Sequence, residues 1–186
     1  MRRISVVGSS GSGKSTLARG LADRLGLAHI ELDAIFHQPN WQGLASDEFR
    51  RQVAARLAGA PNGWVVCGNY SAVRPDLWNA ADTIVWLDLP RHVVMRRVTV
   101  RTIRRVVSRE ELWNGNREPW SNLYRWDPES NVIRWSWTRH PILRHRYAAA
   151  MLDPQWAHLR FVRLCHASDV ELALSVPDAN RTPRMY

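Results

Sequence analysis

The sequence contains the stretch GSSGSGKS at residues 8–15, which is the strongest indication of its fold class. It fits the pattern G-x-x-x-x-G-K-[ST] without a mismatch, and it lies between a short apolar run and a helical pattern. Glycines in such a loop let the backbone turn tightly, so that successive N–H groups point inward at phosphate oxygens. The helix that follows adds the positive end of its dipole. We therefore expect a nucleotide phosphate site, with a chance match in a Gly/Ser-rich turn as the alternative.

The polar side chains of this loop have expected roles. Lys14 is the only lysine among 26 basic residues, and it can reach the β- and γ-phosphates of a nucleoside triphosphate. The Ser15 hydroxyl can ligate Mg²⁺. The residues expected to hold the nucleotide are Gly8, Ser10, Gly11, Ser12, Gly13, Lys14, Ser15 and Thr16.

Short apolar runs alternate with helical patterns along the rest of the chain. Buried strands are predicted at 3–8, 28–32, 63–68, 83–88 and 160–164. Helices are predicted directly after the phosphate loop, at 47–59 behind a Ser46 cap, at 91–109, and around Ser168. Strands separated by helices predict a parallel α/β sheet with helices on both faces.

The composition predicts one ordinary domain, with 186 residues of which 45% are apolar. We place this domain at 1–176 and a flexible tail at 177–186. The net charge of +9 predicts attraction to polyanions without saying which one. Cys67 and Cys165 lack metal-ligand spacing and are expected to be two buried thiols. With no apolar stretch of ~18 residues and no signal segment, we expect a soluble cytoplasmic protein without a membrane partner.

The absence of an N-K-x-D motif argues against a GTPase, because the single lysine is already used in the loop. The chain is also small for a motor or transporter ATPase. A small phosphotransferase remains as the common class with such a loop.

Four further features carry a resemblance: ELDAIFHQPNW (31–41), CGNY (67–70), WLDLP (86–90), and RTIRR (101–105) together with ELWNGNRE (111–118). With them the chain resembles the adenylate-kinase-like P-loop kinases, most closely the bacterial topology modulation proteins or related kinases. The resemblance runs from residue 3 to about 175. It implies a P-loop NTPase three-layer sandwich with a five-stranded parallel sheet in the order 2-3-1-4-5. It also implies ATP and Mg²⁺ as cofactors, and a mobile, helical, Arg-rich lid which, with its flanking helices, covers about residues 101–140.

Three carboxylates are candidates for the chemistry. Asp33 is expected where the second strand meets the edge of the sheet that binds ligands, and Glu31 lies two residues earlier, on the same face of that strand. This pair resembles the D-x-D of shikimate-kinase-like enzymes, which implies that Asp33 accepts the hydroxyl proton of the acceptor or orients it. Asp88 resembles the Walker B carboxylate that holds Mg²⁺ through water. The metal candidates are thus Ser15, Asp33 and Asp88, with Glu31 as a competitor, while Asp33 and Asp88 could instead cap a turn or a helix.

The loop GNYSAVR, residues 68–74, resembles the loop that contacts the acceptor. This implies that Arg74 holds an acidic group of the acceptor and that Asn69 and Tyr70 line its pocket, unless these two only shape the turn. The expected acceptor is a nucleoside, a nucleotide or another small metabolite. CHASD, residues 165–169, resembles the loop whose backbone holds adenine. We expect a monomer or a weak homodimer.

Arginine occupies six of the fourteen positions in RRVTVRTIRRVVSR, residues 96–109. A helix over this stretch places Arg97, Arg101, Arg105 and Arg109 along one side. It also predicts an apolar stripe made of Val93, Val100, Ile103 and Val107. The resemblance implies that Arg101 lies over the nucleotide phosphates, and that Arg105 and Arg109 close on the transferred phosphoryl group as lid residues. About half of the arginines, including Arg96 and Arg104, are expected on a solvated face.

A nucleic-acid-binding ATPase is the second hypothesis. Residues 113–137 combine basic charge with Trp113, Trp120, Trp126, Trp135 and Trp137, and tryptophans stacked on bases would bind single strands. The favoured interpretation is that these tryptophans fill the core beneath helices that pack over the sheet. No known DNA- or RNA-binding motif supports the alternative.

Overall fold

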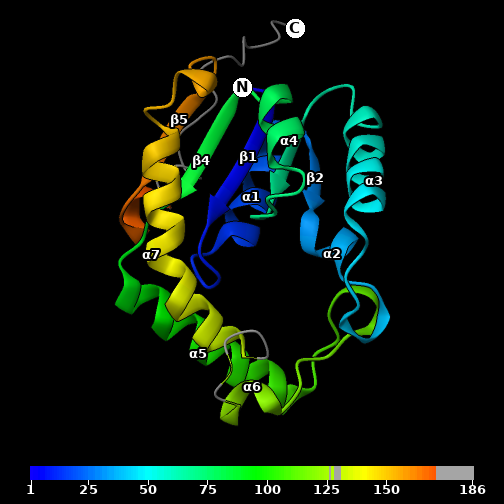
Figure 1. Ribbon diagram of the computed structural model, residues 1–186, viewed down its shortest axis with the longest axis vertical. Coiled ribbons are helices and arrows are strands. Elements are labelled where there is room, and N and C mark those ends of the chain that lie inside the picture. Colours follow the sequence, from blue (N-terminus) through cyan, green and yellow to red (C-terminus); the bar gives the residue numbers. More distant parts are fainter. Residues whose placement is uncertain (126, 128–130, 171–186) are drawn as a thin grey trace, which may run out of the picture.

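A computed structural model of the 186-residue chain describes residues 1–125, 127 and 131–170. Its sheet has five parallel strands: β1 (Arg3–Gly8), β2 (Ala28–Glu31), β3 (Trp64–Cys67), β4 (Thr83–Leu87) and β5 (Arg160–Leu164). They lie in the order β2-β3-β1-β4-β5 (Figure 1). The parallel α/β fold and the strand order expected from the resemblance are confirmed.

Helices and short 3₁₀ turns connect the strands. The helices are α1 (Lys14–Leu25), α2 (Leu32–Phe36), α3 (Ser46–Ala58), α4 (Arg74–Ala80), α5 (Arg91–Ser108), α6 (Ser121–Tyr124) and α7 (Val132–Ala150). The 3₁₀ turns are η1 (Pro39–Trp41), η2 (Trp113–Gly115) and η3 (Pro154–Trp156). The predicted helix at 47–59 begins one residue earlier, so that Ala45 and not Ser46 is its N-cap. Residues 167–170 are helical, close to the helix expected at Ser168. The predicted tail at 177–186 lies outside the described residues.

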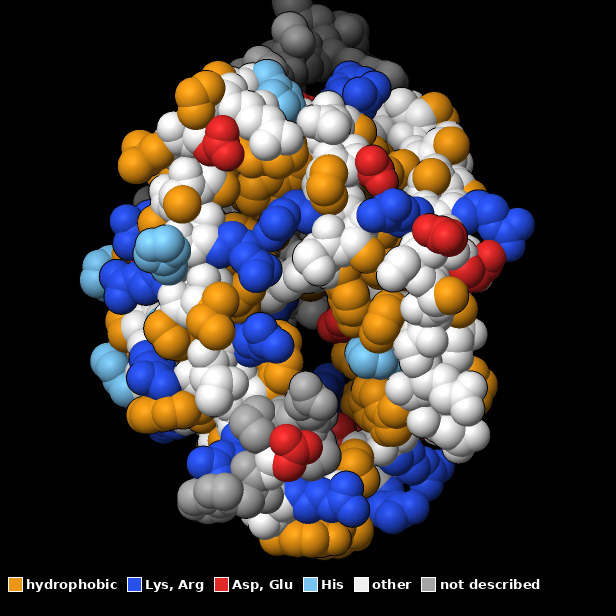
Figure 2. Space-filling view, viewed as in Figure 1, with side chains coloured by type: hydrophobic (Ala, Val, Ile, Leu, Met, Phe, Trp, Pro, Cys, Tyr) orange, Lys and Arg blue, Asp and Glu red, His pale blue; other side chains and the backbone are white. Residues whose placement is uncertain are grey.

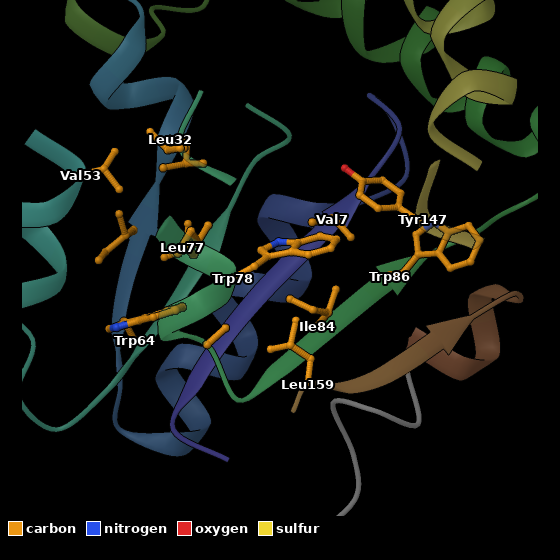
Figure 3. Close-up of a cluster of buried hydrophobic side chains, with 14 of the residues drawn as sticks. Val7, Leu32, Val53, Trp64, Leu77, Trp78, Ile84, Trp86, Tyr147 and Leu159 are labelled. Atoms are coloured by element: carbon orange, nitrogen blue, oxygen red, sulfur yellow. The ribbon is translucent and has the colours of Figure 1, made fainter. Parts of the chain in front are cut away.

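The sheet buries both of its faces. Ile4 and Val6 of β1 pack against α1, whereas Val7 points to the opposite face, because successive side chains alternate across a strand. On that opposite face α3, α4 and α7 cover the larger core, in which Trp78, Trp86 and Tyr147 lie side by side (Figure 3). The result is a three-layer sandwich. Among the helices of the part that the structure describes, none is long and apolar enough to span a membrane.

The prediction of an apolar stripe on α5 is wrong, because its residues are not the ones that pack against the rest of the protein. Val100, Ile103 and Val107 are 60%, 45% and 63% exposed. The buried residues of this helix are Val94, Val98, Thr102 and Val106. They face inward because α5 packs against the phosphate loop and against α7. The arginine side and the buried side of α5 are therefore adjacent, which the sequence pattern did not indicate.

The expectation that the tryptophans of residues 113–137 fill the core is also wrong. Trp120 and Trp137 are about half exposed, and Trp113 and Trp135 are only partly buried, while Trp126 lies outside the described residues. The buried face of α7 consists of Ser136, His140, Leu143 and Tyr147. The tryptophans that do fill the core are Trp64, Trp78, Trp86 and Trp156.

We expect Trp78→Ala to lower the free energy of unfolding by about 3–5 kcal/mol, because it removes a large buried ring. Trp78 is 1% exposed and packs edge-on against Trp156 and Phe161 at ring distances of 5.1 and 5.9 Å. Guanidinium unfolding followed by circular dichroism measures the change. Trp120→Ala is the matched control and should change it by less than about 0.5 kcal/mol. A loss of under about 1 kcal/mol for Trp78→Ala would contradict the packing described here.

Candidate functional site

The phosphate loop joins β1 to α1 and is held closely from two sides. A Cβ added to Gly11, whose φ is +86°, would lie 2.8 Å from the Val94 carbonyl oxygen and 2.9 Å from Val98 Cβ. A Cβ on Gly8 would lie 2.7 Å from the Leu87 carbonyl oxygen. These two glycines therefore let α5 and β4 approach the loop backbone, and this approach brings the arginines of α5 to the loop.

Asn69 binds the start of the phosphate loop. Its Oδ1 accepts from Gly8 N at 3.2 Å, and its Nδ2 donates to Gly8 O at 2.5 Å. Tyr147 of α7 donates its hydroxyl to the same Oδ1 at 3.0 Å. This contact gives Asn69 a structural role in shaping the loop. Its predicted contact with the acceptor stays a prediction.

Lys14 lies at the centre of the site. Its Nζ donates to the Ser9 carbonyl oxygen at 2.9 Å. Burial lowers the pKa of Lys14, while the carboxylates of Asp33 and Glu31 act in the opposite direction. Burial also raises the pKa of the neighbouring Cys67 thiol to about 11, so this thiol carries no charge at neutral pH. The site thus brings one ammonium group together with two carboxylates.

Glu31 and Asp33 reach this site from different elements. Glu31 is the last residue of β2, and Asp33 lies in the first turn of α2, so the predicted placement of both on one strand is wrong. The strand ends one residue earlier than expected, and the chain turns directly into α2, a helix that was not predicted. The Ser15 hydroxyl donates to Glu31 Oε1 at 2.7 Å, and the Tyr70 hydroxyl donates to Asp33 Oδ1 at 2.6 Å. Burial, together with the Asp33 carboxylate, raises the pKa of Tyr70 well above its ordinary value.

Asp88 follows β4 and its carboxylate is paired with arginines. Arg163 Nε donates to Asp88 Oδ2 at 2.9 Å, and Arg144 Nε lies 3.3 Å from the same oxygen. The residue at the N-cap of the following helix is Pro90. The structure thus gives Asp88 a place in an ion-pair network, and its predicted metal role stays a prediction.

Two arginines of α5, Arg97 and Arg101, reach the phosphate loop. Arg101 donates to Ser10 Oγ at 3.0 Å, and burial lowers its pKa. Arg97 donates to the Ser12 carbonyl oxygen at 3.4 Å, a contact for which the sequence offered only the four-residue spacing. Arg105 Nη1 lies 3.3 Å from Glu118 Oε1, whereas Arg109 ends the helix in a left-handed conformation and is exposed.

An open groove of about 740 Å³ runs along the same helix. The residues that line it are His92, Val93, Arg96, Arg97, Val100, Arg101, Arg104, Arg105 and Glu110. Its volume lies in the range of small-molecule sites, and its basic lining suits the phosphates of a nucleotide.

A hollow at the centre of the molecule separates α7 from α2 and α3 (Figure 2). Lys and Arg side chains gather on the α7 side, and a histidine and hydrophobic side chains border the opposite side.

Arg74 lies 5.8 Å from the centre of the Trp78 ring, and its pKa is lowered by burial and by the charge of Arg146. Within the described residues, no acidic side chain forms an ion pair with either arginine.

Comparison with known proteins gives three kinds of match. Residues 10–125 match the family model for shikimate kinase. Shikimate kinase from Synechococcus elongatus is 28% identical over 105 residues, which cover 50% of this chain and 55% of that protein. The match therefore spans about half the length of that relative. Cytidylate kinase from Thermococcus kodakarensis is 30% identical over 159 residues, which cover 70% of this chain and 75% of that protein.

Solved structures share the fold. Gluconokinase from Sinorhizobium meliloti has a TM-score of 0.51 at 20% identity, over 93% of this chain and 89% of that one. Shikimate kinase from Acinetobacter baumannii in complex with shikimate has a TM-score of 0.51 at 16% identity, with the same coverage. The phosphate loop, the sheet order and the match over residues 10–125 lead to one conclusion: the chain belongs to the shikimate kinase family of P-loop kinases.

Proposed function

We propose that this protein transfers the γ-phosphoryl group of Mg·ATP to a small acceptor, which is a nucleoside, a nucleotide or another small metabolite. The observation that carries the proposal is the contact between the phosphate loop and the end of β2, where the Ser15 hydroxyl lies 2.7 Å from Glu31, two residues before Asp33. A phosphate on the loop and a hydroxyl group near Asp33 would then meet in one place. The shikimate and cytidylate kinases among the relatives support this reaction class.

The residues around Ser15 fit a magnesium ion. The Ser15 hydroxyl and the Glu31 carboxylate lie 2.7 Å apart and provide the hard oxygen ligands that Mg²⁺ prefers. Of the three candidate carboxylates, Glu31 is the one that contacts Ser15 directly, so we assign it to the metal shell ahead of Asp88. Bound Mg²⁺ would neutralise charge on the β- and γ-phosphates.

Positive side chains would stabilise the transferred group. Lys14 lies in the loop itself, and Arg97 and Arg101 contact the loop at Ser12 and Ser10. Arg101, Arg105 and Arg109 act as lid residues in this proposal. Guanidinium groups suit the role because their planar forks match charge that is spread over several phosphate oxygens.

Asp33 would accept the proton of an acceptor hydroxyl or hold that hydroxyl in place. One of its oxygens is occupied by Tyr70, which leaves the other for the acceptor. Arg74 would bind an acidic group of the acceptor, and the neighbouring Arg146 adds a second positive charge. Two guanidinium groups without an acidic partner among the described residues favour a phosphorylated or carboxylated acceptor over a neutral one.

The narrower resemblance, to adenylate-kinase-like enzymes and the topology modulation proteins, is part of this proposal. It agrees with the Arg-rich lid and with an adenine site at residues 165–169, where Asp169 accepts hydrogen bonds from the backbone of Cys165 and His166. A cytoplasmic location and a monomeric or weakly dimeric state stay predictions.

We expect Lys14→Ala to lower phosphotransfer by at least ~10²-fold, because the charge on the transferred phosphoryl group loses its closest partner. The measurement is ADP release from Mg·ATP with a panel of nucleosides, nucleoside monophosphates, sugars, small acids and single-stranded DNA. Turnover with one small molecule, lost in the variant, would establish the kinase and name the acceptor. A variant within tenfold of the wild type would contradict the mechanism. ATP hydrolysis stimulated by DNA alone would favour the nucleic-acid-binding ATPase instead.

We expect Asp33→Asn to lower kcat by at least ~10²-fold if the acceptor is a hydroxyl compound, which is the usual effect of losing a general base. The asparagine keeps a hydrogen-bond acceptor for Tyr70, so the fold of the pocket should be preserved. Steady-state kinetics with the acceptor from the panel measure the change. An unchanged kcat would indicate a nucleotide acceptor, whose phosphate needs no base.

We expect Asp88→Asn to lower the free energy of unfolding by about 1–3 kcal/mol, because the side chain is buried and bound by two arginines. The Mg²⁺ concentration that half-saturates nucleotide binding should change by less than about twofold, since the Asp88 carboxylate is bound by arginines and Ser15 by Glu31. Guanidinium unfolding and a Mg²⁺ titration measure the two effects. A large loss of Mg²⁺ affinity with unchanged stability would instead support the metal role predicted from the sequence.

A further inference from the structure

Two hairpins of the same shape meet beside the site, one directly after α2 and one in the proposed lid. The first covers residues 37–43 and the second residues 111–117, and each is closed by one antiparallel bridge between its end residues. The backbone N–H of Gln38 donates to the carbonyl oxygen of Gln42, and that of Leu112 donates to the carbonyl oxygen of Asn116, both at 2.7 Å. The middle residue of each hairpin is an asparagine in the left-handed conformation, Asn40 or Asn114. We call this pair of hairpins the clasp.

The two hairpins of the clasp bind each other through asparagine side chains. Asn116 accepts from the backbone N–H of Trp41 at 2.8 Å and donates to the carbonyl oxygen of Gln38 at 2.9 Å. Asn114 donates to the carbonyl oxygen of His37 at 2.6 Å. Figure 1 shows the lid segment meeting the segment after α2 at this point. Lid side chains thus bind the backbone of the acceptor side.

Trp113 extends this contact to the phosphate loop. Its indole Nε1 donates to Glu31 Oε2 at 3.1 Å, and the other oxygen of the same carboxylate accepts from Ser15. The ring of Trp113 stacks on His37 at 5.9 Å and meets Trp41 edge-on at 6.3 Å. These neighbours fix the indole, so its N–H reaches Glu31 when the lid lies against the first hairpin.

We propose that Trp113 is a positioning residue that couples closure of the lid to the Glu31–Ser15 pair, and this rests on the proposed function. With the clasp closed, one oxygen of Glu31 is held by the lid and the other is directed at the Ser15 hydroxyl. With the lid away, the carboxylate loses one of its two partners and can rotate. The phosphate site is therefore complete only after the lid has closed over the acceptor. This arrangement limits hydrolysis of ATP by the open form.

Trp113→Phe tests the coupling, because phenylalanine keeps an aromatic ring against His37 and loses the N–H donor. The probe is a fluorescent, non-hydrolysable ATP analogue, titrated with Mg²⁺. We expect the half-saturating Mg²⁺ concentration to rise by about threefold or more, and kcat with the acceptor to fall by about tenfold, the scale of a lost hydrogen bond to a charged group. Trp120→Phe, a lid tryptophan that is 52% exposed, is the matched control and should change neither value by more than about twofold.

A double-mutant cycle separates this role from general packing. In a Glu31→Gln background, Trp113→Phe should raise the half-saturating Mg²⁺ concentration by less than about 1.5-fold, because the partner of the N–H is already altered. An equal rise in both backgrounds, or no rise in the wild-type background, would overturn the coupling while leaving the proposed kinase intact. A wild-type chain that binds no Mg·nucleotide would overturn the proposed function and the coupling with it.

Discussion

The hydrogen bonds between the side-chain amide of Asn69 and both backbone groups of Gly8 are the contact on which the site depends. Gly8 is the last residue of β1, where the sheet ends and the phosphate loop begins. The amide of Asn69, just beyond β3, binds this peptide from the side and so fixes the direction in which the loop leaves the sheet. Tyr147 binds the same amide from α7, so this helix is tied to the loop through one residue. A shift of Asn69 would therefore move both the loop and α7.

The charges at the loop form a second constraint. Lys14 is desolvated, which disfavours its charged form, and the carboxylates of Asp33 and Glu31 oppose this effect. The oxygens of these carboxylates are themselves directed by donors: Ser15 and Trp113 bind Glu31, and Tyr70 binds Asp33. Because Cys67 stays neutral, the two carboxylates are the acidic groups that balance the ammonium. The same carboxylates are the groups that a kinase needs for the metal and for the acceptor, so the balance also organises the proposed chemistry.

The sequence predicted those features that depend on neighbouring residues. The loop at 8–15 and the five strands follow from local patterns, and their boundaries were right to within a residue at each end. The prediction of the apolar face of α5 was wrong. Val100, Ile103 and Val107 are exposed but are as apolar as the valines that pack on Gly11, so the sequence pattern could not tell the two sets apart. The clasp was not predicted, because Trp41 and Asn116 are 75 residues apart. Its signal was present in the two short stretches PNWQG and WNGN, each of which has an asparagine where a left-handed turn is needed.

The position of the arginines on α5 bears on which negatively charged partner they meet. Arg97, Arg101 and Arg105 each precede a buried residue of the helix by one position, so they lie at the border of its packed face. From that border Arg97 and Arg101 reach the phosphate loop, and Arg105 is held by Glu118. Arg96 and Arg104 lie one position further from the packed face and are exposed, as expected for a solvated face. A helix that only attracted polyanions would gain nothing from burying the guanidinium group of Arg101, where desolvation and the charge of Arg105 disfavour it. That cost is offset when a phosphate lies between the helix and the loop, which favours a bound nucleotide over a nucleic acid as the partner of this stretch.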